Sequence, residues 1–221
     1  MNAPVLIVNC KAYAEATAAR AVALAKVCEK VGRSSGVLVC IAVQAADIGA
    51  VSSAVSIPVF AQHVDAVRPG QFTGHTLPEA VVANGASGTL INHSERRVPL
   101  DVVDATVRRC RDAGLFSVVC ARDATEAGRV ATLHPDLVAY EPPELVGGDV
   151  SVSTAKPQVI QRAVKKIGTN SACIVGAGVK TAEDVRKSIE LGAHGVLVAS
   201  GVVLAKDQGK ALRALLSGFE S

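Results

Sequence analysis

Residues Leu137 to Gly148 read Leu-Val-Ala-Tyr-Glu-Pro-Pro-Glu-Leu-Val-Gly-Gly, an apolar run followed by a carboxylate, two prolines and a glycine pair. From Leu137 to Tyr140 apolar residues follow one another without alternation, which is typical of a parallel strand buried on both faces. We therefore expect Glu141 where this strand leaves the sheet, partly desolvated and with the raised proton affinity of a general base. Taken alone, Glu141 is more simply interpreted as a solvated loop carboxylate, so the residues after the other strands decide its interpretation.

The same unit, an apolar run followed by a polar or glycine-containing turn and a helical pattern, repeats along the chain. The predicted strands are Val5–Val8, Val37–Ile41, Val59–Ala61, Gly88–Ile91, Ser117–Cys120, Leu137–Tyr140, Ala172–Val175 and Gly195–Val198. The predicted helices are approximately Ala14–Val31, Ala45–Val55, Pro78–Ala83, Leu100–Ala113, Ala124–Leu133, Lys156–Ile167, Ala182–Leu191 and Lys206–Leu216. Eight such units in 221 residues predict an α/β fold, a compact (β/α)8 barrel that forms one domain over residues 1–221. The alternative, an open doubly wound sheet, is disfavoured because no Gly-x-Gly-x-x-Gly motif follows the first strand.

The composition predicts a compact soluble protein, since 49% of the residues are hydrophobic, 19% are charged and 3% are aromatic. No apolar run is long enough to cross a membrane, and the first residues lack the basic region of a signal peptide. The net charge of +3 is spread over scattered Lys and Arg residues without stacking aromatics, which argues against a nucleic-acid partner. We therefore expect a cytoplasmic protein that binds neither nucleic acid nor membrane.

The cysteine and histidine spacings predict neither disulfides nor a metal site. The six cysteines form no Cys-x-x-Cys pair, and several lie inside apolar runs, which is typical of reduced, buried thiols. They are Cys10, Cys28, Cys40, Cys110, Cys120 and Cys173. The histidines away from the strand ends show no metal-ligand spacing and are interpreted as structural or solvated.

Polar residues and glycines follow five of the predicted strands. They are Asn9-Cys10-Lys11, Asn92-His93-Ser94-Glu95-Arg96-Arg97, Glu141, Gly176-Ala177-Gly178 and Ala199-Ser200-Gly201. A closed barrel brings the carboxyl ends of all its strands to one face, so we expect these residues to meet there. Glycine loops after the seventh and eighth strands are the usual phosphate site of such barrels, because their backbone N–H groups can surround an anion. One Gly-x-Gly alone equally serves a tight turn, but together with Gly147-Gly148 these loops predict a bound phosphate.

The lysine and histidine in this set each have a simpler interpretation. Lys11 fits a surface lysine, and His93 fits a histidine hydrogen-bonded to the barrel wall. A lysine directly after an apolar strand is nevertheless placed to direct its ammonium group inward at an anion. Glu95, Arg96 and Arg97 are expected to form ion pairs that hold their loop.

Several of these motifs, in this order, resemble the triosephosphate isomerase family along the length of the chain. They are Asn9-x-Lys11, Ala61-Gln62, Thr73-Gly74, His93-Ser94-Glu95-Arg96-Arg97 and Tyr140-Glu141-Pro142. The short length and the Glu-Pro-Pro-Glu-Leu sequence resemble the compact archaeal form of that family. The run from His93 to Arg97 with the downstream Tyr-Glu-Pro is a highly specific pattern.

The resemblance implies a role for each residue at the strand ends, and these roles are the known ones of the family. Glu141 would be the base, His93 a neutral electrophile kept uncharged by a helix start beside it, and Lys11 a stabiliser of negative charge. Asn9 would orient the substrate. The lid would run from Pro142 to about Ser153. Backbone groups at Val146, Gly147, Gly178, Ala199, Ser200 and Gly201 would hold the phosphate.

The implied reaction interconverts dihydroxyacetone phosphate and D-glyceraldehyde 3-phosphate through an enediolate, in glycolysis or gluconeogenesis, and needs no metal or redox cofactor. The resemblance also implies a homodimer or homotetramer, in which the long segment from Arg68 to Glu79 docks into a neighbouring subunit and Thr73 reaches its site. Three alternatives stay open: another phosphate-binding barrel isomerase or lyase, a non-catalytic sugar-phosphate-binding barrel, and a structural scaffold.

Overall fold

The computed structural model describes residues 3–142 and 157–220. Within this part of the chain, eight parallel strands pair in sequence order, and the last pairs with the first to close a barrel. The strands are β1 (Val5–Asn9), β2 (Leu38–Val43), β3 (Val59–Ala61), β4 (Gly88–Ile91), β5 (Phe116–Ala121), β6 (Leu137–Tyr140), β7 (Ala172–Val175) and β8 (Gly195–Val198). The predicted compact (β/α)8 barrel is confirmed, and the alternative of an open sheet is wrong.

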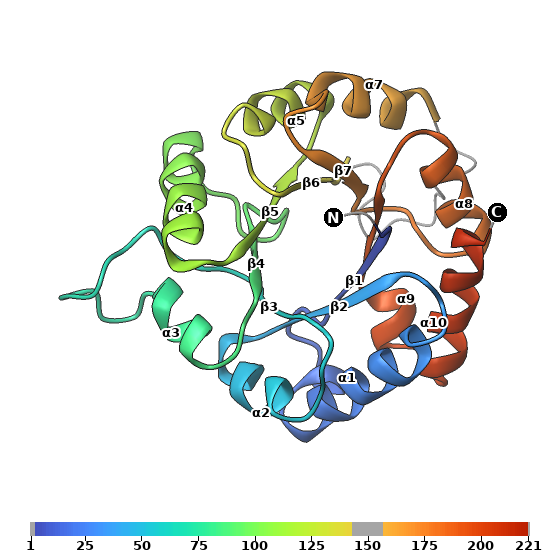
Figure 1. The fold of residues 1–221 in the computed structure, drawn as a ribbon, viewed down its shortest axis with the longest axis horizontal. Helices are drawn as coiled ribbons and strands as arrows, with labels where there is room; N and C mark the ends of the chain where they lie inside the picture. The colour runs from blue at the N-terminus through green and yellow to red at the C-terminus, as the bar shows by residue number, and fades with distance from the viewer. Residues whose placement is uncertain (1–2, 143–156, 221) are drawn as a thin grey trace.

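Helices form a ring around the strands (Figure 1). They are α1 (Ala19–Gly32), α2 (Ile48–Ser52), α3 (Pro78–Ala83), α4 (Leu100–Ala113), α5 (Ala124–Ala131), α7 (Pro157–Ile167), α8 (Ala182–Glu190), α9 (Ser200–Val203) and α10 (Gln208–Leu216), with the 3-10 helices η1 (Ala14–Ala16), η2 (Ala45–Asp47) and η4 (Ser217–Phe219). Five strands, namely β3, β4, β6, β7 and β8, and the helices α3 and α4 have the predicted bounds.

Two of the predicted helices are interrupted. The helix expected over Ala14–Val31 is split into η1 and α1, because Ala18 has a φ of 54° between them. The N–H of Ala18 donates a hydrogen bond to Oδ1 of Asp47 at 3.1 Å, which holds the break from the next unit of the barrel. The helix expected over Ala45–Val55 is divided into η2 and α2, and the short α9 after β8 was not predicted.

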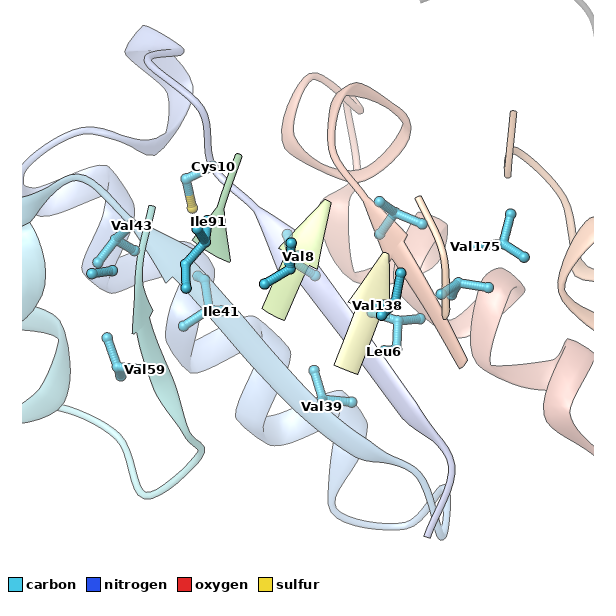
Figure 2. Close-up of a cluster of buried hydrophobic side chains, with 14 of the residues drawn as sticks. Leu6, Val8, Cys10, Val39, Ile41, Val43, Val59, Ile91, Val138 and Val175 are labelled. Atoms are coloured by element: carbon cyan, nitrogen blue, oxygen red, sulfur yellow. The ribbon is translucent and has the colours of Figure 1, made fainter. Parts of the chain in front are cut away.

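Alternate residues of each strand face opposite sides of the sheet. Leu6 and Val8 of β1 pack outward, in the layer between the strands and the helices. Figure 2 shows part of this outer layer, in which the labelled side chains are Leu6, Val8, Cys10, Val39, Ile41, Val43, Val59, Ile91, Val138 and Val175. In β6, Leu137 and Ala139 belong to the other cluster, which fills the barrel interior, and the same alternation directs Glu141 inward. The strand period therefore places a carboxylate at the mouth of the barrel.

The segment between β3 and α3 projects beyond the ring of helices (Figure 1, left). Its base is closed by Asp65, whose N–H donates to the carbonyl of Thr76 at 2.9 Å and whose Oδ2 accepts the N–H of Thr76 at 2.6 Å. Phe72 is 46% exposed, and its ring packs edge-on against His75. The segment thus presents an aromatic side chain away from the body of the barrel.

All six cysteines are buried and unpaired. Burial raises the pKa of Cys28, Cys40 and Cys173 to about 12, so these thiols stay protonated at neutral pH. Across residues 3–142 and 157–220, no helix combines the length and the hydropathy that a membrane crossing would need.

Candidate active site

A cavity of about 410 Å³ opens at the carboxyl ends of the strands. Its walls come from the loops after β1, β4, β6, β7 and β8, as expected for a closed barrel. The predicted site residues that line it are Asn9, Lys11, His93, Glu141, Gly178, Ala199, Ser200 and Gly201. The predicted Val146 and Gly147, and nearly all of the predicted lid, lie outside the described residues.

Glu141 is almost completely enclosed, with 1% of its surface exposed. Burial raises the pKa of this carboxyl to about 7, although the Ser94 N–H and the Cys120 thiol hydrogen-bond to it and oppose the rise. The Ser94 N–H lies 3.2 Å from Oε2 of Glu141. A carboxylate with this proton affinity can take up and release a proton near neutral pH.

His93 is held in one neutral tautomer. The backbone N–H of Glu95 donates to Nδ1 of His93 at 3.2 Å, so Nδ1 carries no proton and the ring proton belongs to Nε2. This Nε2 lies 3.3 Å from Oε1 of Glu141, which can accept from it. It also lies 3.4 Å from Nδ2 of Asn9, a contact between two donors in this tautomer. Nδ2 of Asn9 is assigned as the donor end because Oδ1 accepts the N–H of Lys11.

Burial, more than any charge, lowers the pKa of His93 to about 4. Lys11 and Arg97 act in the same direction, while the carboxylate of Glu95 opposes them. The predicted helix start beside His93 is wrong, because α4 begins only at Leu100. The imidazole is kept neutral by desolvation instead of a helix dipole.

Lys11 reaches the rim of the cavity through an unusual backbone conformation, with a φ of 47°. Its Nζ lies 2.8 Å from Oε1 of Glu95, which confirms that Glu95 forms an ion pair. Gln62, directly after β3, donates to Oδ1 of Asn9 at 3.3 Å and to the carbonyl of Lys11 at 2.9 Å. The sequence singled out Gln62 only within the family resemblance, although a polar residue directly after a buried strand was a usable signal.

The other end of the cavity is built from backbone. Gly178 has a φ of 72°, and Ser200 and Gly201 form the first turn of α9, where backbone N–H groups have no partner within the helix. A Cβ on Gly201 would meet no atom within 4 Å, so this position faces open space. Such a surface suits an anion with several oxygen atoms.

Gly176 and Ala177, from the glycine loop predicted to bind an anion, also line the cavity. The other lining residues had no predicted role, namely Tyr13, Ser94, Val179, Lys180, Leu197 and Val198. Within the described ranges, no three His, Cys, Asp or Glu side chains are grouped closely enough to hold a metal ion.

A closed (β/α)8 barrel whose strand ends bring a buried carboxylate, an imidazole and a lysine to one cavity has the architecture typical of an enzyme. The chain matches the triosephosphate isomerase family over residues 4–216 and belongs to it.

Named relatives agree with this assignment. The triosephosphate isomerase of Methanopyrus kandleri is 47% identical over 100% of both chains. That of Methanocaldococcus jannaschii is 43% identical over 96% of this chain and 98% of its own. The relatives are isomerases, and the resemblance to the short archaeal form is confirmed.

The crystal structure of triosephosphate isomerase from Bartonella henselae is similar, with a TM-score of 0.78 over 99% of each chain. Its sequence identity to this chain is 17%, so this likeness supports the fold alone.

Proposed function

We propose that this protein interconverts dihydroxyacetone phosphate and D-glyceraldehyde 3-phosphate through an enediolate. The observation that carries the proposal is the pairing of Glu141, whose pKa is raised to about 7, with Nε2 of the neutral His93 at 3.3 Å. Isomerisation requires a base that removes a proton from carbon and a neutral donor that moves a proton between two oxygens. The two side chains match these two requirements.

Glu141 is the base in this scheme. Its carboxylate takes the proton from one carbon of the substrate and returns it to the neighbouring carbon. His93 donates the hydrogen bond of Nε2–H to the carbonyl oxygen, and a neutral imidazole matches the weak acidity of an enediol better than an imidazolium does. The acceptor contact at Nδ1 supports this tautomer.

Lys11 stabilises the negative charge that develops on the substrate oxygens. Its ammonium is fixed by Glu95 at 2.8 Å, and fixed charge lowers the reorganisation that the reaction requires. Asn9, which is 3% exposed and tied to Gln62, orients the substrate from the floor of the cavity.

The phosphate binds to backbone groups of Gly178, Ala199, Ser200 and Gly201, which line the same cavity. Val146 and Gly147, which the family resemblance adds to this set, lie outside the described residues, as does nearly all of the lid expected over Pro142 to about Ser153. We infer that no redox cofactor takes part, because moving one proton between adjacent carbons requires no external electron acceptor. We also infer that no metal ion is needed, because Lys11 supplies the fixed positive charge that stabilises the enediolate.

The segment from Arg68 to Glu79 docks against a second copy of the chain in a homodimer or homotetramer, with Thr73 reaching the partner's site. The exposure of Phe72 supports this assignment. We further propose that residues 1–221 act as one domain in the cytoplasm, in glycolysis or gluconeogenesis.

A coupled assay tests the reaction: D-glyceraldehyde 3-phosphate is supplied, and a reductase specific for dihydroxyacetone phosphate reports product. Turnover that is lost in both Glu141→Gln and His93→Gln supports the proposal. Binding of the sugar phosphate without turnover would instead favour the non-catalytic sugar-phosphate-binding barrel. Absence of both binding and turnover would favour a different phosphate-linked substrate or a scaffold.

A further inference from the structure

Asn92 stands between strand β4 and His93 and has a backbone conformation that is uncommon outside glycine. Its φ is 59°, in the left-handed region, and it is 2% exposed. Left-handed backbone is costly for most L-residues, and Asn and Gly are the residues that tolerate it best. This reversal turns the chain immediately before His93, so the conformation of Asn92 sets the direction in which His93 leaves the strand.

The side chain of Asn92 is fully used in hydrogen bonds. Nδ2 donates to the carbonyl of Cys120 at 2.9 Å and lies 3.5 Å from Oε1 of Glu126. Oδ1 accepts the N–H of Val98 at 3.0 Å, which closes the loop that carries His93. Glycine would allow the same φ but would remove the side-chain hydrogen bonds to the Cys120 carbonyl and the Val98 N–H.

The other end of the loop that carries His93 also contacts the Cys120 carbonyl and the Glu126 carboxylate. Nη1 of Arg97 donates to the carbonyl of Cys120 at 3.4 Å and to Oε2 of Glu126 at 3.3 Å. Both ends of the loop are therefore fastened to one point on the neighbouring unit of the barrel. The thiol of Cys120 in turn hydrogen-bonds to Glu141, so this point also contacts the proposed base.

We propose that Asn92 is a positioning residue that fixes the imidazole of His93 against Glu141. This inference rests on the proposed function, in which His93 donates through Nε2. Asn92 is not among the described residues that line the cavity, so it acts through His93 and not on the substrate. Its contribution is the combination of a left-handed backbone with three hydrogen bonds, and neither part alone is sufficient.

Asn92→Gly separates these two parts, because glycine keeps the left-handed backbone and removes the hydrogen bonds. We expect kcat to fall roughly 10-fold to 100-fold with KM changed much less, since a displacement of about 1 Å can have this effect on rate. His134→Gly is the matched control: it also has positive φ, at 54°, but its side chain is exposed and it precedes β6 at the opposite end of the barrel. Its kcat and KM should stay within about twofold of the original protein.

Nitrogen NMR of the His93 ring gives a second readout that does not depend on activity. In the original protein the ring should show the Nε2–H tautomer with an acceptor at Nδ1. In Asn92→Gly we expect mixed tautomers or a higher His93 pKa, because the ring is no longer held in its buried position. Unchanged His93 signals together with unchanged kcat in Asn92→Gly would overturn the inference.

The two proposals fail in different ways. If the original protein does not isomerise the substrate, the proposed function fails, and the NMR comparison still measures whether Asn92 positions the ring. If the original protein is active and His93→Gln is not, but Asn92→Gly retains full kcat, only the role of Asn92 is rejected.

Discussion

Gly176, the first residue after β7, packs directly against the side chain of Glu141. A Cβ at position 176 would lie 2.6 Å from Cγ of Glu141, closer than atoms of adjacent side chains can approach. The missing side chain therefore creates the space that the carboxylate occupies. Gly176 was predicted to belong to an anion-binding loop, whereas the atoms nearest to its Cβ position are those of the proposed base.

Gly176→Ala should displace Glu141 and lower kcat by roughly 10-fold to 100-fold, because the base moves away from its position beside His93. The comparison is Gly209→Ala in α10, where a Cβ would make only ordinary contacts at 3.5 Å. That control should be fully active and slightly more stable, by about 0.5–1 kcal/mol, since alanine is favoured over glycine in helices. Full activity of Gly176→Ala in the coupled assay would show that the cavity tolerates a moved carboxylate.

The pH dependence of kcat/KM should show an acid limb near pH 7. Glu141 must be ionised to act as the base, and its pKa is raised to about 7. His93 does not contribute to this limb, because its pKa is lowered to about 4 and it remains neutral above that value. The substrate phosphate itself titrates near pH 6. Glu141→Asp is the control, because it should shift the part of the pH profile that is due to residue 141 and leave the titration of the substrate unchanged. A limb near 4.5 would mean that Glu141 is hydrated in the free enzyme.

Glu141 should make a pH-dependent contribution to the free energy of unfolding, and Glu141→Gln should remove this contribution. Because the native pKa of Glu141 is raised from 4.5 to about 7, the native state retains a proton that the unfolded chain has lost between these values. The free energy of unfolding therefore falls as pH rises from 4.5 to 7 and then stays lower. Glu141→Gln lacks this effect, so its stability relative to the original protein should rise over this range by about 1–3 kcal/mol.

Chemical denaturation at several pH values checks this expectation, since contributions from other titrating groups cancel in the difference. A difference that does not change with pH would show that the carboxyl has an ordinary pKa in the native state.

Inorganic phosphate should protect the protein against thermal unfolding. At a concentration 100 times its dissociation constant, a ligand stabilises the native state by about 2.7 kcal/mol. Gly201→Asp should abolish most of this protection, because position 201 faces open space in the cavity and the added carboxylate repels the anion. Thermal unfolding followed by calorimetry, with chloride at equal ionic strength as the comparison, gives the answer. Equal protection of both proteins would place the phosphate elsewhere.

Most of the fold followed from local patterns because strands buried on both faces are continuous apolar runs. The same strand period places Glu141 inward after Leu137 and Ala139, so the position of the carboxylate was predictable. The break at Ala18 was not, since the Asp47 that holds it lies in the next unit and no local residue signals it. The four-residue α9 is too short for a helical period to appear.

The chemistry of the site was less predictable than its location. The tautomer of His93 depends on one backbone N–H, that of Glu95, and no sequence pattern fixes such a contact. The low pKa of the ring comes from burial among several loops, a property of the assembled barrel and not of one motif. The motifs therefore predicted which residues form the site, whereas the protonation states of these residues could be derived only from the three-dimensional structure.

Because all six thiols are buried, their labelling by a thiol reagent would measure local opening of the native structure. Cys10, Cys28, Cys110 and Cys173 are buried between strands and helices, and Cys40 and Cys120 in the barrel interior. A thiol-reactive disulfide reagent can label them only when the surrounding packing opens, so labelling reports transient exposure. Cys10 and Cys120 lie beside the cavity loops, whereas Cys110 lies in α4. Mass spectrometry of the labelled positions would therefore give the opening rate of each region separately.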